Sequence, residues 1–133
     1  MASIPAEARH LFEGRNFAHL ATLNRDGSPQ VSPIWVGLDG ELVTLNTTEG
    51  LVKTKNLRNN PAIAISIIDH DNPYESLLIQ GVVAEMSSEG AEAGIDALSK
   101  RYLDVESFPF RQPSDKRVIV KLEPVKVYHR VAT

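Results

Sequence analysis

The sequence predicts a mainly β fold, an antiparallel barrel or sandwich of six or seven strands with about three short peripheral helices. Two turn signals, Asn-Arg-Asp-Gly at residues 24–27 and Asp-Gly at 39–40, end 13 residues apart and indicate consecutive hairpins. No long helical pattern alternates with the strands, so a doubly wound parallel sheet is not expected. The 133 residues suit one domain over residues 1–133.

The first half of the chain is expected to combine two short helices with the hairpins. The spacing of one buried helix face is shown by four apolar residues: Ile4, Ala8, Leu11 and Phe12. The turn signals then join three predicted strands into an antiparallel meander: residues 17–23, 29–38 and 41–46. A short helix is predicted over residues 51–60, capped by Thr47 or Thr48 and closed by Pro61.

The second half supplies the remaining strands. Residues 62–69 alternate isoleucines with small residues, which predicts a strand with one large and one small face. A longer strand over 75–86 contains Gly81, which indicates a bulge or a close backbone approach. The last two strands are predicted on either side of Glu123 and Pro124: residues 116–122 and 125–129.

A third helix is expected between these strands. Its apolar face consists of four residues: Ala91, Ile95, Leu98 and Tyr102. Ser87 or Ser88 is the predicted cap. An irregular connection over residues 104–114 follows and carries Phe108 and Phe110.

The composition excludes several classes of function. The chain has no cysteine, so disulfides and thiolate chemistry are absent. Its 14 basic and 17 acidic residues give a net charge of −3, so the chain lacks the excess of positive charge that is typical of nucleic-acid binding. It has neither a signal-peptide pattern nor an apolar run of the roughly 20 residues that a membrane span needs. We therefore expect a cytoplasmic protein without nucleic-acid or membrane partners.

Motifs for metal binding and catalysis are also missing. No two of the four histidines have the spacing of metal ligands, such as H-x-x-x-H. They are His10, His19, His70 and His129. We expect no metal, with His19 in the core or an interface and His70 in an acidic surface loop. The sequence contains no G-x-S-x-G, P-loop or G-x-G-x-x-G motif, so no catalytic residue can be assigned.

The segment over residues 46–58 is a candidate anion site. A predicted strand ends at Asn46, and hydroxyl residues and Gly50 follow before a short helix. That helix carries three cations: Lys53, Lys55 and Arg58. Unpaired amides at a helix start attract anions, so the segment could hold a phosphate. On spacing alone, an ordinary capped helix with a solvated basic face remains the favoured interpretation.

Trp35, the only tryptophan, marks a second candidate. Pro33 cannot donate a ladder hydrogen bond, so it indicates an edge strand or a bulge with exposed backbone nearby. An exposed edge beside an aromatic ring could receive a flat ligand. Core packing of Trp35 remains the favoured interpretation of these residues alone.

A series of motifs covers nearly the full chain in a distinctive order. They are His-Leu-Ala-Thr at 19–22, Asp-Gly-Ser-Pro-Gln-Val-Ser-Pro-Ile-Trp at 26–35, Lys-Thr-Lys-Asn-Leu-Arg-Asn-Asn-Pro at 53–61, Asn-Pro-Tyr at 72–74, Gln-Gly-Val-Val at 80–83, Arg-Tyr-Leu at 101–103, Phe-Pro-Phe at 108–110 and Arg-Val-Ile-Val at 117–120. Together they resemble the pyridoxamine 5′-phosphate oxidase-like split β-barrel superfamily, in its branch that depends on the deazaflavin coenzyme F420.

The resemblance implies a homodimer of split β-barrels with a cofactor at each subunit interface. It also implies hydride transfer between the deazaflavin and a small unsaturated or electron-poor organic substrate. In such an enzyme the cofactor supplies the redox chemistry, and the protein binds and orients it. The implied cofactor-binding residues are Gln30, Ser32, Pro33, Ile34, Trp35, Asn46, Thr47, Thr48, Lys53, Lys55, Tyr74, Ser76, Leu77 and Arg117, of which Tyr74 to Leu77 come from the second subunit.

One position departs from the resemblance. Many relatives have an arginine where this chain has Leu51, two residues before Lys53. Without that fork-shaped donor, Lys53 holds the phosphate as a point charge. FMN therefore stays open as the alternative cofactor, and a non-enzymatic coenzyme- or haem-binding protein as the alternative function.

Overall fold

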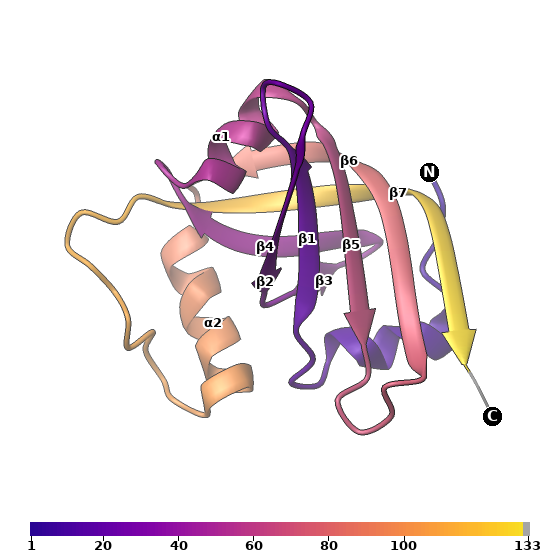
Figure 1. Cartoon of the computed structure of the whole chain (residues 1–133). Coiled ribbons are helices and arrows are strands. Elements are labelled where there is room, and N and C mark those ends of the chain that lie inside the picture. The colour runs from indigo at the N-terminus through magenta and orange to yellow at the C-terminus, as the bar shows by residue number, and fades with distance from the viewer. Residues whose placement is uncertain (132–133) are drawn as a thin grey trace.

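The computed structural model describes residues 1–131, and over these residues the chain forms one seven-stranded antiparallel sheet, two α-helices and a 3₁₀ helix (Figure 1). The elements are η1 (Ala6–Phe12), β1 (Ala18–Leu23), β2 (Pro29–Ile34), β3 (Gly37–Asp39), β4 (Leu42–Thr48), α1 (Val52–Asn59), β5 (Ala62–Ile68), β6 (Glu75–Ser87), α2 (Ala91–Leu103) and β7 (Arg117–Val131). The predicted mainly β class is confirmed. In this part of the chain, every helix is too short and too polar to cross a bilayer. The predicted domain range of 1–133 extends two residues beyond the described part.

The sheet is not the simple meander that the turn signals predict. Its strand order is β2-β1-β5-β6-β7-β4-β3, so β2 and β3 lie at opposite edges. The expected strand over 29–38 is therefore wrong, because the chain leaves the sheet at Trp35 and Val36. There the backbone of Val36 bonds to α2: its N–H donates to Tyr102 Oη at 3.2 Å, and its carbonyl accepts from Arg101. The edge position that Pro33 predicted for β2 is confirmed.

The two longest strands, β6 and β7, are neighbours inside the sheet and curve together (Figure 1). Their pairing shifts register between Gln80 and Gly81, which places Gly81 opposite Pro124. A Cβ atom on Gly81 would lie 2.4 Å from the Glu123 carbonyl oxygen, so the predicted close backbone approach is confirmed. The expected break at Glu123 and Pro124 is wrong, because the register shift lets β7 continue through the proline.

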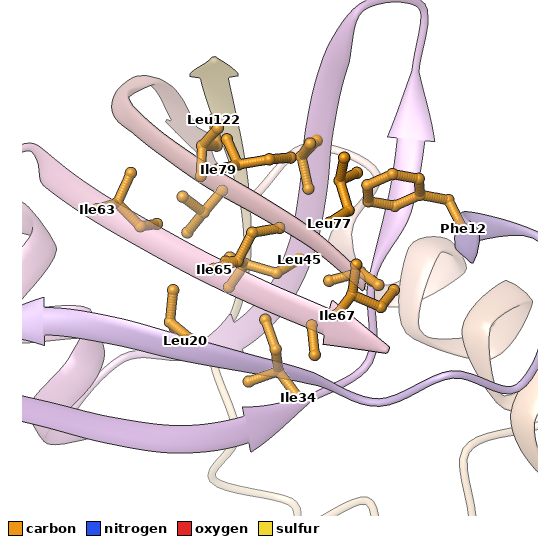
Figure 2. Close-up of a cluster of buried hydrophobic side chains, with 14 of the residues drawn as sticks. Phe12, Leu20, Ile34, Leu45, Ile63, Ile65, Ile67, Leu77, Ile79 and Leu122 are labelled. Atoms are coloured by element: carbon orange, nitrogen blue, oxygen red, sulfur yellow. The ribbon is translucent and has the colours of Figure 1, made fainter. Parts of the chain in front are cut away.

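The core lies inside the curl of this sheet (Figure 2). The alternation along β5 is confirmed, since Ile63, Ile65 and Ile67 are buried. Figure 2 shows them packed with other large side chains, among them Leu20, Leu45, Leu77, Ile79 and Leu122. The predicted apolar face of the first helix is also buried, although η1 is a 3₁₀ helix.

The predicted helix caps are wrong. β4 continues to Thr48, so the hydroxyls of Thr47 and Thr48 precede the turn at Gly50 instead of capping α1. Similarly, α2 begins after Gly90, whose φ of 75° is left-handed, and no side chain caps it. Ser87 Oγ instead accepts from the Glu89 N–H at 3.1 Å.

Candidate functional site

A cleft of about 210 Å³ lies where the ends of β2 and β4 meet α1, α2 and the start of β7. In Figure 1 the long connection between α2 and β7 runs along this side of the sheet. We call this cleft the α1–α2 cleft. Its lining residues are Phe17, Pro33, Ile34, Trp35, Asn46, Lys53, Ile95, Leu98, Phe108, Phe110 and Arg117.

One wall of the α1–α2 cleft is a fixed aromatic surface. The ring of Trp35 stacks on Tyr102, with centroids 5.0 Å apart and an interplanar angle of 6°. Tyr102 is buried, and its hydroxyl donates to the Asn16 carbonyl at 2.6 Å. Phe108 meets Trp35 edge-on at 6.1 Å. Trp35 is therefore half-buried as a lining residue with one face packed on the protein, and not a core residue.

Two cations also line the cleft. Lys53 comes from α1 and Arg117 from the first residue of β7. Burial, with the neighbouring Arg117 charge as a second cause, lowers the pKa of Lys53 below its usual value. Burial also lowers the pKa of Arg117, and its ion pair with Asp115 is long at 3.9 Å. The site thus brings two cations together, while Asp115 and Glu92 are the carboxylates that act on Arg117.

The guanidinium of Arg117 is only partly satisfied by the protein. Its Nη1 donates to Asn46 Oδ1 at 3.2 Å, and its guanidinium lies 4.6 Å from the centre of the Phe108 ring. Its Nε is buried without a hydrogen-bond partner among the described residues. Because a buried orphaned donor is costly, the cleft fits a ligand that brings an acceptor, such as a phosphate.

Six of the predicted cofactor-binding residues line this cleft: Pro33, Ile34, Trp35, Asn46, Lys53 and Arg117. Thr47 lies beside it on β4, but its buried hydroxyl bonds to Thr54 Oγ1 at 2.9 Å. The Thr48 carbonyl accepts from the same Thr54 hydroxyl at 2.7 Å. The predicted anion segment therefore contributes a cation and not a cradle of free hydroxyls.

The other predicted residues lie outside the α1–α2 cleft. Gln30 bonds to Thr22 Oγ1 at 3.3 Å, and Ser32 is a half-buried residue of β2. Lys55 lies on a different face of α1, in a separate hollow. Three predicted residues lie at the start of β6: Tyr74 precedes the strand, and Ser76 and Leu77 are within it. Leu77 is fully buried in the core, whereas Tyr74 is exposed.

Sequence reasoning left five lining residues out of the site: Phe17, Ile95, Leu98, Phe108 and Phe110. The signal for two of them was the Phe-Pro-Phe motif in the irregular connection. That connection is tied to α2, because Arg111 pairs with Glu92 and Asp96. The Phe108 N–H also donates to Asp96 Oδ1 at 2.8 Å.

The outer face of the sheet is apolar and uncovered. Val31, Leu78 and Tyr128 are exposed around a hollow of about 520 Å³ on β1, β2, β5, β6 and β7. His19 also lines this hollow and is exposed, so the core placement considered for it is wrong.

The comparison with known proteins agrees with this architecture. The sequence pattern of the pyridoxamine 5′-phosphate oxidase family matches residues 4–130. A solved structure called F420 reductase is 34% identical, with a TM-score of 0.81 over 94% of this chain and 98% of that chain.

More distant structures share the fold. A conserved hypothetical protein from Mycobacterium tuberculosis is 20% identical, with a TM-score of 0.75 over 98% of this chain and 86% of that chain. A FAD-binding protein from Mesorhizobium loti is 19% identical, with a TM-score of 0.71 over 99% of this chain and 98% of that chain. Given the match over residues 4–130 and the 34% identity to the F420 reductase, this chain belongs to the pyridoxamine 5′-phosphate oxidase family and has its split β-barrel fold.

Proposed function

We propose that this protein is an oxidoreductase that binds coenzyme F420 in the α1–α2 cleft. It transfers a hydride between that coenzyme and a small unsaturated or electron-poor organic substrate. One observation carries the proposal: Lys53 and Arg117 line the same cleft as the Trp35 ring, which is stacked on Tyr102. This pairing of half-buried cations with a flat aromatic surface complements a phosphate joined to a planar ring system.

The choice of F420 over other flavin-type cofactors has two supports. The relative with 34% identity over nearly the whole chain is called an F420 reductase. In addition, Arg25, Lys55 and Arg58 line a hollow of about 480 Å³ on the outer side of α1. Its positive charge suits the acidic tail that distinguishes F420 from FMN, although Arg58 also pairs with Glu49 at 2.5 Å.

The residues of this chain bind and orient the coenzyme, which supplies the hydride chemistry when bound. Lys53 and Arg117 would hold its phosphate, and the Arg117 Nε, which has no partner among the described residues, would gain an acceptor. Trp35 offers a flat surface for the ring, held in place by Tyr102. Phe108 and Phe110 line the same region and meet each other edge-on. Over the described residues, neither a carboxylate nor an imidazole lines the cleft, so its contribution is binding and orientation.

The working form in this proposal is a homodimer with the coenzyme at the subunit interface. The exposed apolar face around Val31, Leu78 and Tyr128 would be buried by a second copy. Of the residues that the resemblance assigns to the second subunit, Tyr74 is exposed and Ser76 half-buried, so these two of that copy would complete the ring site, whereas Leu77 lies in the core. Light scattering with sedimentation, with and without coenzyme, tests this arrangement. A monomer that binds coenzyme at full stoichiometry would contradict it.

FMN remains the second candidate, because Leu51 stands at the start of α1 where many relatives have an arginine. Haem is less well supported. In the part of the chain that the structure describes, the cleft lining contains no histidine or methionine to ligate an iron atom.

Titrations of the purified protein with F420 and with FMN, followed by Trp35 fluorescence, test the proposed cofactor. We expect saturable quenching by both compounds with the tighter binding for F420, because Trp35 lines the cleft. Saturable FMN binding without detectable F420 binding would contradict the F420 assignment. Mass spectrometry of the chromophore released from protein purified from its native host gives an independent answer.

A further inference from the structure

A second group of charged residues lies away from the α1–α2 cleft, at the opposite end of β7. His10 of η1, Asp69 of the β5–β6 connection and Glu75 at the start of β6 each offer one ligand-type atom, and these atoms lie within 4.8 Å of one another. In Figure 1, η1, the β5–β6 connection and the end of β7 meet at the same end of the molecule. We call these three residues the His10–Asp69–Glu75 cluster.

The separations within the cluster match a coordination sphere. His10 Nε2 lies 3.2 Å from Glu75 Oε1 and 3.5 Å from Asp69 Oδ2. A tetrahedral Zn²⁺ with bonds of about 2.1 Å has ligand atoms about 3.4 Å apart. The two measured distances lie on either side of that value.

The carboxylates are already held in place. Asp69 Oδ1 accepts from the backbone N–H groups of Asp71 and Asn72, which leaves Oδ2 to face His10. Glu75 is buried, and its Oε2 is bonded to His129 Nε2 at 2.9 Å, which leaves Oε1 to face the same imidazole. Such an outer hydrogen bond orients metal-binding carboxylates in many proteins.

The charge of the cluster favours a cation. Asp69 and Glu75 carry two negative charges side by side, and one of them is on a buried side chain. Among the described residues, the only basic groups within 4.0 Å of either carboxylate are the imidazoles of His10 and His129. A divalent ion at the cluster would neutralise both carboxylates.

We propose that His10, Asp69 and Glu75 bind a divalent transition-metal ion, with Zn²⁺ as the best match to a mixed imidazole and carboxylate site. Half of the His10 side chain is exposed, so a fourth position is open to water. None of these residues lines the α1–α2 cleft. The bound ion ties η1 to the sheet and stabilises the folded chain by mass action.

Calorimetric titration of the untagged, metal-free protein with Zn²⁺ tests the proposal, with Mg²⁺ as the comparison ion. We expect one Zn²⁺ per chain, a raised unfolding temperature, and at least tenfold weaker binding in His10→Gln and Glu75→Gln. His129→Gln leaves the three ligands in place and is expected to lose about ten- to a hundredfold in affinity.

The matched control is His70→Gln, because His70 is an exposed histidine of the same connection outside the cluster. We expect this variant to bind Zn²⁺ like the unmodified protein. If Glu75→Gln does not fold, the His10→Gln variant still decides, because His10 is half-exposed. Absence of saturable Zn²⁺ binding, or equal affinity in His10→Gln and His70→Gln, would overturn the proposal.

Discussion

The two ends of β7 carry clusters of opposite charge. Arg117 is its first residue and lies with Lys53 in the α1–α2 cleft, whereas His129 near its end supports Glu75 in the His10–Asp69–Glu75 cluster. The nearest carboxylate to Arg117 is 3.9 Å away, and the two carboxylates of the other cluster have only imidazoles beside them. Buried charge of one sign without matching counter-charge indicates a ligand of the other sign. The same strand therefore separates an anion site from a cation site.

The largest expected effect is a loss of coenzyme affinity at the anion site, with no change at the cation site. Lys53→Ala should weaken coenzyme binding by roughly ten- to over a hundredfold, the cost of a lost charge-assisted contact of about 1.5–3 kcal/mol. Lys55→Ala is the matched control, because Lys55 lies on another face of α1 and should mainly change association rate and salt dependence. Fluorescence titration measures both variants.

Zn²⁺ binding should be unchanged in Lys53→Ala, since Lys53 contacts none of the cluster residues. Equal coenzyme affinity in Lys53→Ala and the unmodified protein would show that the basic residues of α1 form only a solvated surface.

The second prediction concerns the backbone between the two sites. Gly81→Ala should destabilise the fold by about 2–3 kcal/mol, because its Cβ would lie 2.4 Å from the Glu123 carbonyl oxygen. Urea unfolding measures the loss. Ala84→Gly is the control, because it exchanges the same two small residues at the other register shift of β6, between Val83 and Glu85. A stability loss no larger than that of the control would contradict the close approach.

The third prediction tests the support behind the Trp35 ring. Tyr102→Phe keeps the stacked ring but removes the hydroxyl that bonds to the Asn16 carbonyl and the Val36 N–H. We expect a loss of about 1–2 kcal/mol in unfolding free energy, since both buried backbone groups lose a partner. Coenzyme binding should weaken and Zn²⁺ binding should not, as titrations of the folded variant would show. Unchanged stability would mean that water replaces the hydroxyl.

Local pattern predicted those features that depend on near neighbours. The alternation of Ile63, Ile65 and Ile67 marks the buried face of β5, and Gly81 marks the close approach of β7. Pro33 marks an edge strand because a missing N–H has the same consequence wherever the strand lies. These signals need only the residue and its immediate backbone.

The errors share a different cause. The strand break at Trp35 and Val36 depends on Arg101 and Tyr102, which lie more than 60 residues later in the sequence. Likewise, the separation of 65 residues between His10 and Glu75 hides their proximity from any spacing rule. Such sites depend on the strand order, which local periodicity does not specify.

The smallest expected effect is a pH dependence of the anion site, and its sign follows from the lowered pKa of Lys53. Burial and the Arg117 charge bring this pKa below 10.5, so rising pH neutralises Lys53 before an exposed lysine. Coenzyme affinity should therefore fall as the pH passes the lowered pKa. The unfolding free energy of the coenzyme-free protein should instead rise with pH between the lowered pKa and about 10.4. In that window the unfolded chain still holds the Lys53 proton and the folded chain has lost it, so the unfolded state binds more protons.

Lys53→Arg separates this effect from other groups that titrate in alkali, because arginine keeps its charge throughout the range. The difference in coenzyme affinity between the unmodified protein and Lys53→Arg should grow with pH, starting below 10.5. The Zn²⁺ affinities of the unmodified protein and Lys53→Arg should not differ in this way, since the proposed Zn²⁺ ligands lie at the other end of β7. A constant ratio of the two coenzyme affinities across the alkaline range would show that Lys53 keeps an ordinary pKa and that the charge of the cleft is compensated.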